Sequence, residues 1–337
     1  MRHTTGIPRL QRGFTLIELL VVIIVIGILS AMSVVVVRTA MNSGKGATVK
    51  TQMQQLAIAL DSYKAKVGEY PPDNFLDTAA LERHLKKRWP RARYDNIVEA
   101  FLNAVVDIDT SAADGGVPAM ARGSYVSPLI FFLGGPLGPG NKSMGFCLSP
   151  TDPFGLNAGA NAQREEPFFK FPEKSITRLN GVWAFMPQEA PILYFRSEPK
   201  SKYFRGEGDS TVISDTFSDA AGYTGIKYWP MDAELDGGSV ICGVWGNTAA
   251  EYGTVTPFVS GFEENADPTL LPIPIWCDAD SFQLIHPGMD KAFALPIGEE
   301  SLEEFRVNAP RQLGDLTPAD EDTITSFSEG LTAGSEK

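Results

Sequence analysis

One acidic residue, Glu18, stands in an otherwise apolar run near the start of the chain. The run extends from Phe14 to Val37, and Gly13 with a basic stretch precedes it. A carboxylate at mid-membrane costs about 2.5–3.5 kcal/mol on a translocon-type scale, so acidic residues in such runs usually serve a function. Glu18 is therefore the first candidate functional residue.

The segment that positions Glu18 is long enough to cross a bilayer. Residues 14–37 would form about 36 Å of helix, against about 30 Å of hydrocarbon core. We therefore expect a transmembrane helix over 14–37. A secretory signal peptide has a shorter apolar region with its small cleavage-site residues after that region, whereas Gly13 precedes this run. An ordinary signal anchor, with Glu18 at the interface by chance, is the other interpretation.

The string Gly13-Phe-Thr-Leu-Ile-Glu18 resembles the processing site of type IV prepilins and type II secretion pseudopilins. The resemblance implies that residues 1–13 are a leader, which a prepilin peptidase removes between Gly13 and Phe14 before methylating the amine of Phe14. It also implies that Glu18 pairs with the N-terminal amine of a neighbouring subunit. The chain would then cross the inner membrane once, with its N-terminus cytoplasmic and its C-terminal domain periplasmic.

The helix is predicted to continue beyond the apolar run, over residues 38–70. From Ala47 onward, apolar residues recur at spacings of three and four, which indicates one buried stripe. Two glycines in Asn42–Gly46 each weaken a helix by about 1 kcal/mol relative to Ala, so we expect a melted segment there. Residues 56–71 resemble the end of the long N-terminal helix in major pseudopilins, through Ala59-Leu60-Asp61, Tyr63-Lys64 and Gly68-Glu-Tyr70-Pro71.

The resemblance implies an α+β fold, in which the long N-terminal helix packs on a small antiparallel sheet. The first half of this helix would be transmembrane and the second amphipathic, and residues 71–337 would form the periplasmic domain. Pro191–Arg196 resembles the first strand of the pseudopilin sheet, and Ser281–Asp290 reads as a strand followed by a turn. Residues 197–275 read as a long, weakly patterned insertion.

Residues 75–109 read as additional helices interrupted at Pro90, with six basic residues between their apolar faces: Arg83, Lys86, Lys87, Arg88, Arg91 and Arg93. A solvated face is one interpretation of this basic cluster. A second is contact with an acidic surface of the next subunit, formed by residues 299–304 or 315–322. A third is a nucleic-acid patch in which Trp89 and Tyr94 stack with bases. The chain is acidic as a whole, with a net charge of −12, which argues against broad nucleic-acid binding.

The resemblance also implies a calcium site near the C-terminus. In the family two loops hold the ion, and their counterparts here would supply Asp290, Asp320 and Asp322. Calcium takes six to eight oxygen ligands, usually several carboxylates and backbone carbonyls. Residues 291–319 are longer than the usual connection between these loops, and an acidic solvated tail is the alternative.

The three cysteines, Cys147, Cys242 and Cys277, permit one disulfide in an oxidising compartment and leave one thiol over. Type IV pilins often have a disulfide near the C-terminus, so the resemblance favours Cys242–Cys277. That bond would close a loop of about 35 residues and contribute on the order of 3–4 kcal/mol. Three buried thiols are the alternative, and no spacing indicates a zinc site.

No catalytic motif stands out in the sequence. The histidines are His3, His84 and His286, of which only His286 is a plausible acid–base residue. Nucleophile-elbow, zinc-protease and phosphate-binding motifs are absent. Abundant carboxylates leave a glycosidase-like site open. The sequence nevertheless predicts that the chain is not an enzyme.

The sequence therefore predicts a structural subunit of a type II secretion pseudopilus or of a related type IV pilus-like filament. The expected partners are further copies of the chain, other pseudopilins, the prepilin peptidase and the inner-membrane secretion platform, and no nucleic acid. The alternative from another class is a membrane-anchored periplasmic binding or adhesion protein that the prepilin pathway only delivers.

Overall fold

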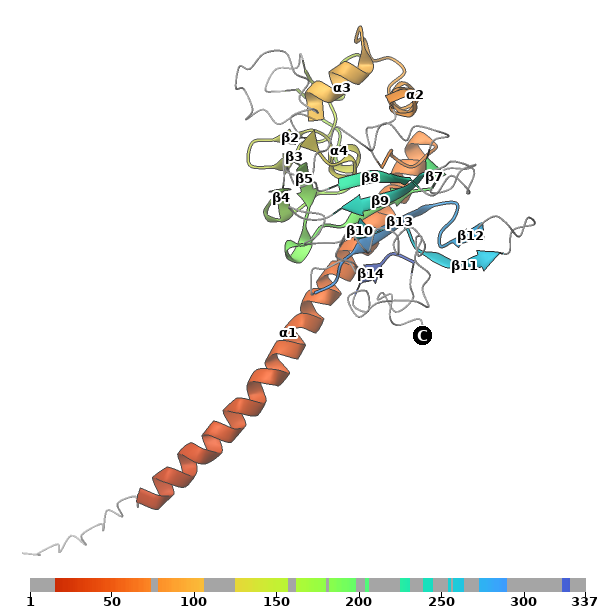
Figure 1. The fold of residues 1–337 in the computed structure, drawn as a ribbon. Helices are drawn as coiled ribbons and strands as arrows, with labels where there is room; N and C mark the ends of the chain where they lie inside the picture. The colour runs from red at the N-terminus through yellow and green to blue at the C-terminus, as the bar shows by residue number, and fades with distance from the viewer. Residues whose placement is uncertain are drawn as a thin grey trace, which may run out of the picture. The chain divides into compact units, whose positions relative to one another are not determined.

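The structure is a computed structural model that describes residues 16–73, 78–105, 125–156, 162–179, 182–197, 204–205, 225–230, 239–244, 254–255, 257–263, 273–289 and 323–327. The chain divides into two compact units, Met1–Ala47 and Thr48–Lys337. Helix α1 (Leu16–Val67) contributes residues to both units (Figure 1).

Helix α1 is continuous through Asn42–Gly46, so the prediction of a melted segment there is wrong. A glycine lowers helix stability, but its N–H and C=O groups still join the hydrogen-bond ladder, and the helical residues on either side carry the helix through. Helix α1 ends at Val67, three residues before the predicted bound at residue 70. Gly68 adopts φ +90°, and its N–H donates to the Lys64 carbonyl at 2.7 Å, as in a left-handed helix cap.

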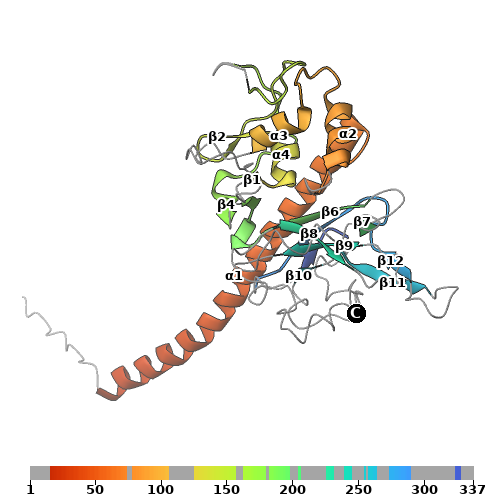
Figure 2. The same cartoon turned by 45° about the horizontal axis from the view of Figure 1, so that its top comes forward.

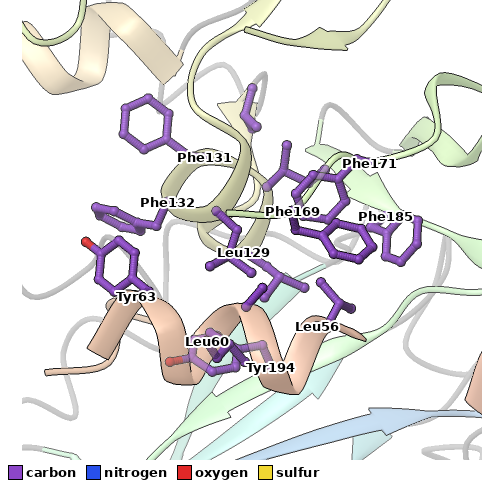
Figure 3. Packing of buried hydrophobic residues seen from close by; sticks show 14 of the residues in the cluster. Leu56, Leu60, Tyr63, Leu129, Phe131, Phe132, Phe169, Phe171, Phe185 and Tyr194 are labelled. Carbon is purple, nitrogen blue, oxygen red and sulfur yellow. The ribbon is translucent and has the colours of Figure 1, made fainter. Parts of the chain in front are cut away.

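The core of the second unit forms around the C-terminal part of α1. Its predicted stripe is buried at Val49, Met53, Leu56, Leu60 and Tyr63. In Figure 3, Leu56 and Tyr63 point from α1 toward the residues of α4 (Pro128–Gly134), and phenylalanines from later segments fill the space beside them. The amphipathic pattern therefore correctly predicts which face of the helix is buried in this unit.

Three shorter helices cover this core. Helices α2 (Thr78–Arg88) and α3 (Ile97–Val105) pack against each other, which confirms the helices predicted in 75–109 with an interruption around Pro90 (Figure 2). Helix α4 begins after Ser127, whose hydroxyl accepts a hydrogen bond from the Ile130 N–H, and residues 129–134 are all buried. Among the described residues, the 3₁₀ turns η3 (Glu173–Ser175) and η4 (Pro187–Glu189) contact each other.

A three-stranded antiparallel sheet in the order β14-β13-β6 packs on α1, which confirms the predicted α+β architecture. Its strands are β6 (Leu193–Arg196), β13 (Phe282–His286) and β14 (Ile324–Thr325). Leu193 pairs with Ile285, and Ile324 pairs with His286. The strands predicted in 191–196 and 281–290 are therefore both present, and they are neighbours.

The remaining described strands form four further sheets. One has the order β1-β5-β4, with β1 (Tyr125–Val126) parallel to β5 (Val182–Phe185) and β4 (Ile176–Leu179) antiparallel to it. A hairpin joins β2 (Leu137–Gly138) to β3 (Lys142–Ser143) through residues 139–141.

The predicted insertion, residues 197–275, contains strands that its weak pattern did not indicate. Strand β9 pairs with β7, β8 and β10, and β11 pairs with β12. Their bounds are β7 Phe204–Arg205, β8 Gly225–Pro230, β9 Ser239–Val244, β10 Thr254–Val255, β11 Val259–Glu263 and β12 Ile273–Trp276.

Candidate assembly site

The first turn of α1 carries Glu18 within an exposed apolar surface. Every large apolar side chain from Leu16 to Leu29 is at least 48% exposed. Because consecutive helical residues point in all directions around the axis, the exposed surface is apolar on every side. Gly13 and Phe14 lie outside the described residues, so their predicted roles stay predictions.

Within the described residues, we find no helix that is both long enough and apolar enough to cross a membrane. The side chains of residues 31–40 are not among those described.

Several hydrogen bonds join the segment after α1 to the sheet β14-β13-β6, which we call the central sheet. Tyr194 of β6 donates to the Pro71 carbonyl at 2.8 Å, and the Arg196 N–H donates to the Asp73 carboxylate at 2.9 Å. Tyr70 in turn donates to the Asp61 carboxylate at 2.9 Å. Asp61, Tyr70 and Pro71 therefore help to anchor the helix to the sheet. These three residues also carry the resemblance to the end of the pseudopilin helix.

Three polar residues that the sequence did not bring together form a hydrogen-bonded chain between α1 and α2. The Tyr63 hydroxyl lies 2.8 Å from Nε2 of His84, and Nδ1 of His84 lies 2.7 Å from a Glu69 carboxylate oxygen. An ionised carboxylate can only accept, so Nδ1 carries the proton and Nε2 accepts from Tyr63. Both Tyr63 and His84 are buried.

The histidine in this chain of hydrogen bonds is neutral at pH 7 because it is buried. Burial lowers the pKa of His84 below its ordinary value, although the Glu69 carboxylate acts in the opposite direction. The hydrogen bond from His84 holds the pKa of Glu69 down to about 2. Burial raises the pKa of Tyr63, which stays a neutral hydroxyl. The sequence signal for this contact was limited to the position of His84 between two buried leucines of α2.

Most of the basic cluster is exposed on this chain, and one member is nearly buried. Five of the six side chains are exposed, while that of Arg88 is only 9% exposed and lies 2.7 Å from the Glu165 carboxylate. Lys66 of α1 binds the same carboxylate at 2.6 Å, so Glu165 joins α1 to α2. The acidic segments proposed as its intersubunit partners lie outside the described residues.

His286, the one histidine that the sequence left as a plausible acid–base residue, has a structural role. It is fully buried at the end of β13, and both ring nitrogens bind backbone. Nδ1 accepts from the Gly288 N–H at 3.1 Å, so Nε2 is the donor to the Pro187 carbonyl, also at 3.1 Å. Burial lowers the pKa of His286 to about 4. Neither nitrogen is available for proton transfer to a substrate.

The predicted calcium ligands Asp290, Asp320 and Asp322 lie outside the described residues. In the part of the chain that is described, no three His, Cys, Asp or Glu residues are placed to hold a metal ion. Cys277 is buried in the turn after β12, whereas the side chain of Cys242 in β9 is not described. Both the calcium site and the Cys242–Cys277 disulfide stay predictions.

Comparison with known proteins places these features in a class. A family model described as the prokaryotic N-terminal methylation motif matches residues 8–34, which include Gly13, Phe14 and Glu18. The chain thus carries a prepilin-type motif. Over 63 residues it is 41% identical to the type II secretion system core protein G of Pseudomonas aeruginosa. The resemblance to type II secretion pseudopilins, predicted from the sequence, is confirmed.

The matched region is a small part of the chain. It covers 19% of this chain and 44% of the relative, so the chain spans less than half the length of that curated relative. No solved structure matches the chain. Both matches support the prediction of a structural pilin-like subunit that is not an enzyme.

Proposed function

We propose that the chain is a structural subunit of a type II secretion pseudopilus, or of a related type IV pilus-like filament, assembled in the inner membrane to support protein secretion. The observation that carries this proposal is a methylation motif joined directly to a helix with an exposed apolar surface from Leu16 to Leu29. A helix that is apolar on all sides requires lipid or other protein around it. A membrane pool of subunits and a filament core would supply these two surroundings.

In our proposal, processing creates a positive charge, the new amine of Phe14, close to Glu18 in the sequence. In our proposal the peptidase cuts between Gly13 and Phe14 and methylates the new amine of Phe14. Glu18 lies four residues further, about one helical turn away. An isolated amine and an isolated carboxylate are both costly in lipid, so each favours a partner on a neighbouring copy. The offset between Phe14 and Glu18 would then set the axial step at which a new copy docks.

The proposed topology follows from the same processing step. The leader, residues 1–13, lies in the cytoplasm, the helix over 14–37 crosses the inner membrane once, and the later domain lies in the periplasm. The proposed partners are further copies of the chain, other pseudopilins, the prepilin peptidase and the inner-membrane secretion platform.

The test is filament incorporation by the Glu18→Gln chain, produced together with a prepilin peptidase and a secretion platform. We expect the wild-type chain to show the mass of a methylated chain beginning at Phe14 and to be recovered in sheared filaments. Glu18→Gln should fold but be lost from the filament fraction, because it keeps the side-chain shape and removes the charge. Glu82→Gln is the matched control, since Glu82 is a half-exposed carboxylate of α2.

Each outcome separates the candidates. Normal filament incorporation of Glu18→Gln would contradict the pairing of Glu18 with an amine. A wild-type chain that is processed but never enters filaments would contradict the structural role, and would favour the binding or adhesion protein delivered by the prepilin pathway.

We also propose that Asp290, Asp320 and Asp322 bind calcium. They lie on two segments, one after β13 and one before β14. Strands β13 and β14 support this, because His286 pairs with Ile324 and the chain therefore runs toward Asp290 and away from Asp322 at the same end of one strand pair. The hydroxyl of buried Thr323 has no hydrogen-bond partner among the described atoms. An all-oxygen donor set with several carboxylates suits Ca²⁺. When bound, the ion would hold the two segments together.

Calorimetric titration of the full chain in detergent tests the calcium site. We expect Ca²⁺ to bind the wild-type chain and to bind the Asp322→Ala chain at least tenfold more weakly, with Asp95→Ala, an exposed site in the interruption between α2 and α3, as the control. A wild-type chain that takes up no Ca²⁺ would overturn the proposal.

The Cys242–Cys277 disulfide is proposed on the likeness to type IV pilins. Intact mass after alkylation under non-reducing conditions should show one modified thiol, at Cys147. Three modified thiols in protein isolated from the periplasm would contradict the bond.

A further inference from the structure

The hydrogen-bonded chain of Tyr63, His84 and Glu69 joins three successive parts of the backbone. Tyr63 lies on α1, Glu69 lies in the turn after it, and His84 lies on α2. The rings of Tyr63 and His84 also stack, with centroids 5.9 Å apart and planes 12° apart. The edge contact of Phe132 with His84, at 5.2 Å, closes the site from the side of α4. These contacts hold α2 against the end of α1.

The Tyr63 hydroxyl keeps its acceptor only while the imidazole is neutral. A second proton, at Nε2, would donate to the Tyr63 oxygen, so the hydrogen bond would reverse and the hydroxyl hydrogen would lose its acceptor. A buried donor without an acceptor typically destabilises a protein by the free energy of its desolvation. Protonation therefore keeps both bonds of the histidine but leaves an unpaired hydroxyl donor and a buried positive charge in the contact between α1 and α2.

Among the described charges around His84, the Glu69 carboxylate favours the protonated form and the neighbouring cations oppose it. Lys87 of α2 lies 3.1 Å from the Glu69 carboxylate and shares it with the histidine. Arg88 lies over the ring of Tyr63, and Arg196 of β6 adds a third positive charge that disfavours a charged His84. The other carboxylate nearby, Glu165, is already bound by Lys66 and Arg88.

We propose that Tyr63, His84 and Glu69 form an acid-sensitive latch that holds α2 against the end of α1 at neutral pH and opens when His84 takes up a proton. Histidine is the side chain whose ordinary charge change falls between pH 5 and 8, and buried histidines act in this way in pH-dependent rearrangements. A domain exposed to the medium outside the inner membrane would meet such acidification directly. The latch does not depend on filament assembly. Its test, local hydrogen exchange, can therefore fail while the proposed function holds, and the reverse is also possible.

The expected pH dependence follows from proton linkage. His84 binds a proton less readily in the closed form than in the open form, so lowering the pH below about 6.5 favours opening. The equilibrium constant for opening should rise by up to tenfold for each pH unit below that value, until the closed form is also protonated. Glu69 adds acid sensitivity only below its ordinary value of 4.5, because its pKa in the closed form is held to about 2.

Hydrogen exchange of the full chain in detergent tests the latch. Exchange at residues 63–69 and 78–88, corrected for intrinsic rates, would be measured from pH 7.5 to pH 5. We expect opening at these segments to increase about tenfold or more in the wild-type chain. In His84→Gln the same segments should respond to pH less than threefold, because glutamine does not titrate. Glu82→Gln, a change on the exposed side of the same helix, should behave as wild type.

A second measurement keeps the test decisive if His84→Gln fails to fold. The latch requires the pKa of His84 in the folded wild-type chain to lie below its ordinary value of 6.5. That pKa can be read by NMR of histidine-labelled protein, since the chain has only 3 histidines. A pKa of 6.5 or above, or equal pH dependence of local exchange in wild type and His84→Gln, would overturn the latch.

Discussion

Tyr194 and Pro71 are 123 residues apart in sequence, yet the hydroxyl of Tyr194 donates a hydrogen bond to the Pro71 carbonyl at 2.8 Å. The bond is buried and joins the segment after α1 to strand β6. Tyr194 also contacts Phe282 of β13, with ring centroids 6.1 Å apart. One side chain thus connects the end of the long helix to two strands of the central sheet.

The Tyr194→Phe change should destabilise the protein by about 1–2 kcal/mol, because it leaves the buried carbonyl of Pro71 without its donor. Equilibrium urea unfolding followed by tryptophan fluorescence would measure this. Ser260→Ala is the control, since the Ser260 hydroxyl makes an exposed hydrogen bond to the Ile275 carbonyl. An equal effect of the two changes would contradict the importance we assign to burial.

Gln283→Met should be more destabilising, by about 3 kcal/mol or more. The fully buried amide of Gln283 accepts from the Phe258 N–H at 2.7 Å and donates to the carbonyls of Phe258 and Cys277 at 3.0 and 2.7 Å. Methionine has a similar volume but removes all three hydrogen bonds, so the Phe258 N–H loses the amide oxygen and the Phe258 carbonyl keeps its bond from the Cys277 N–H. Unfolding in urea measures the loss, and the exposed Gln163→Met provides the comparison. A loss below 1 kcal/mol would show that these groups find other partners.

Replacing large side chains of α1 by alanine should destabilise the protein strongly on the buried face of the helix and only slightly on the exposed face. Leu60→Ala removes a fully buried side chain from the core and should cost about 2–5 kcal/mol through lost burial and the cavity left behind. Ile58→Ala, two residues away, removes a side chain that is 66% exposed and should cost less than about 0.5 kcal/mol. Thermal unfolding of the two variants side by side would check the difference, and similar melting temperatures would be inconsistent with the packing described.

Glycine is required at position 145 for two reasons, and a matched glycine separates them. Gly145 and Gly140 share a positive φ, +72° and +73°, which disfavours any other residue by about 1–2 kcal/mol. A Cβ at Gly145 would also collide with the backbone carbonyl of Glu165, whereas at Gly140 it would meet nothing within 4 Å. We expect Gly140→Ala to lose about 1 kcal/mol in urea unfolding and Gly145→Ala at least about 3 kcal/mol. Equal losses would mean that the loop at Glu165 moves aside freely.

Stability should fall on acidification because of His286, apart from the latch at His84. The pKa of His286 in the folded chain is about 4, against an ordinary value of 6.5, so the unfolded chain binds this proton more readily. The stabilisation is complete above pH 6.5 and is lost as the pH falls toward 4, at up to about 1.4 kcal/mol per pH unit and about 3 kcal/mol in all. Urea unfolding of the His84→Gln chain from pH 7.5 to pH 4 isolates this contribution. A further His286→Gln change should flatten the dependence.

The sequence predicted those parts of the fold whose signal is local. The recurrence of Val49, Met53, Leu56 and Leu60 at spacings of three and four identifies the buried face of α1 because a helix repeats every 3.6 residues. The methylation motif identified Gly13, Phe14 and Glu18 for the same reason, since all its members lie within one short stretch.

The sequence failed where contacts depend on tertiary packing. Residues 128–134 form a helix buried on all sides, and a uniformly apolar segment of that length has no period to distinguish helix from strand. The contact of Tyr63 with His84 depends on how α2 docks on α1, which no local pattern encodes. In the same way, any charge that pairs with Glu18 on another copy lies beyond what a single chain can display.

The order β14-β13-β6 has a consequence for how the chain is made. The middle strand is flanked by residues 193–196 on one edge and by residues 324–325 on the other, so one edge stays open until the last described strand has left the ribosome. Closing such long loops slows folding, and an open strand edge is a template for pairing between chains. Each nascent copy therefore passes through an aggregation-prone interval, and a premature stop before residue 323 would make that interval permanent.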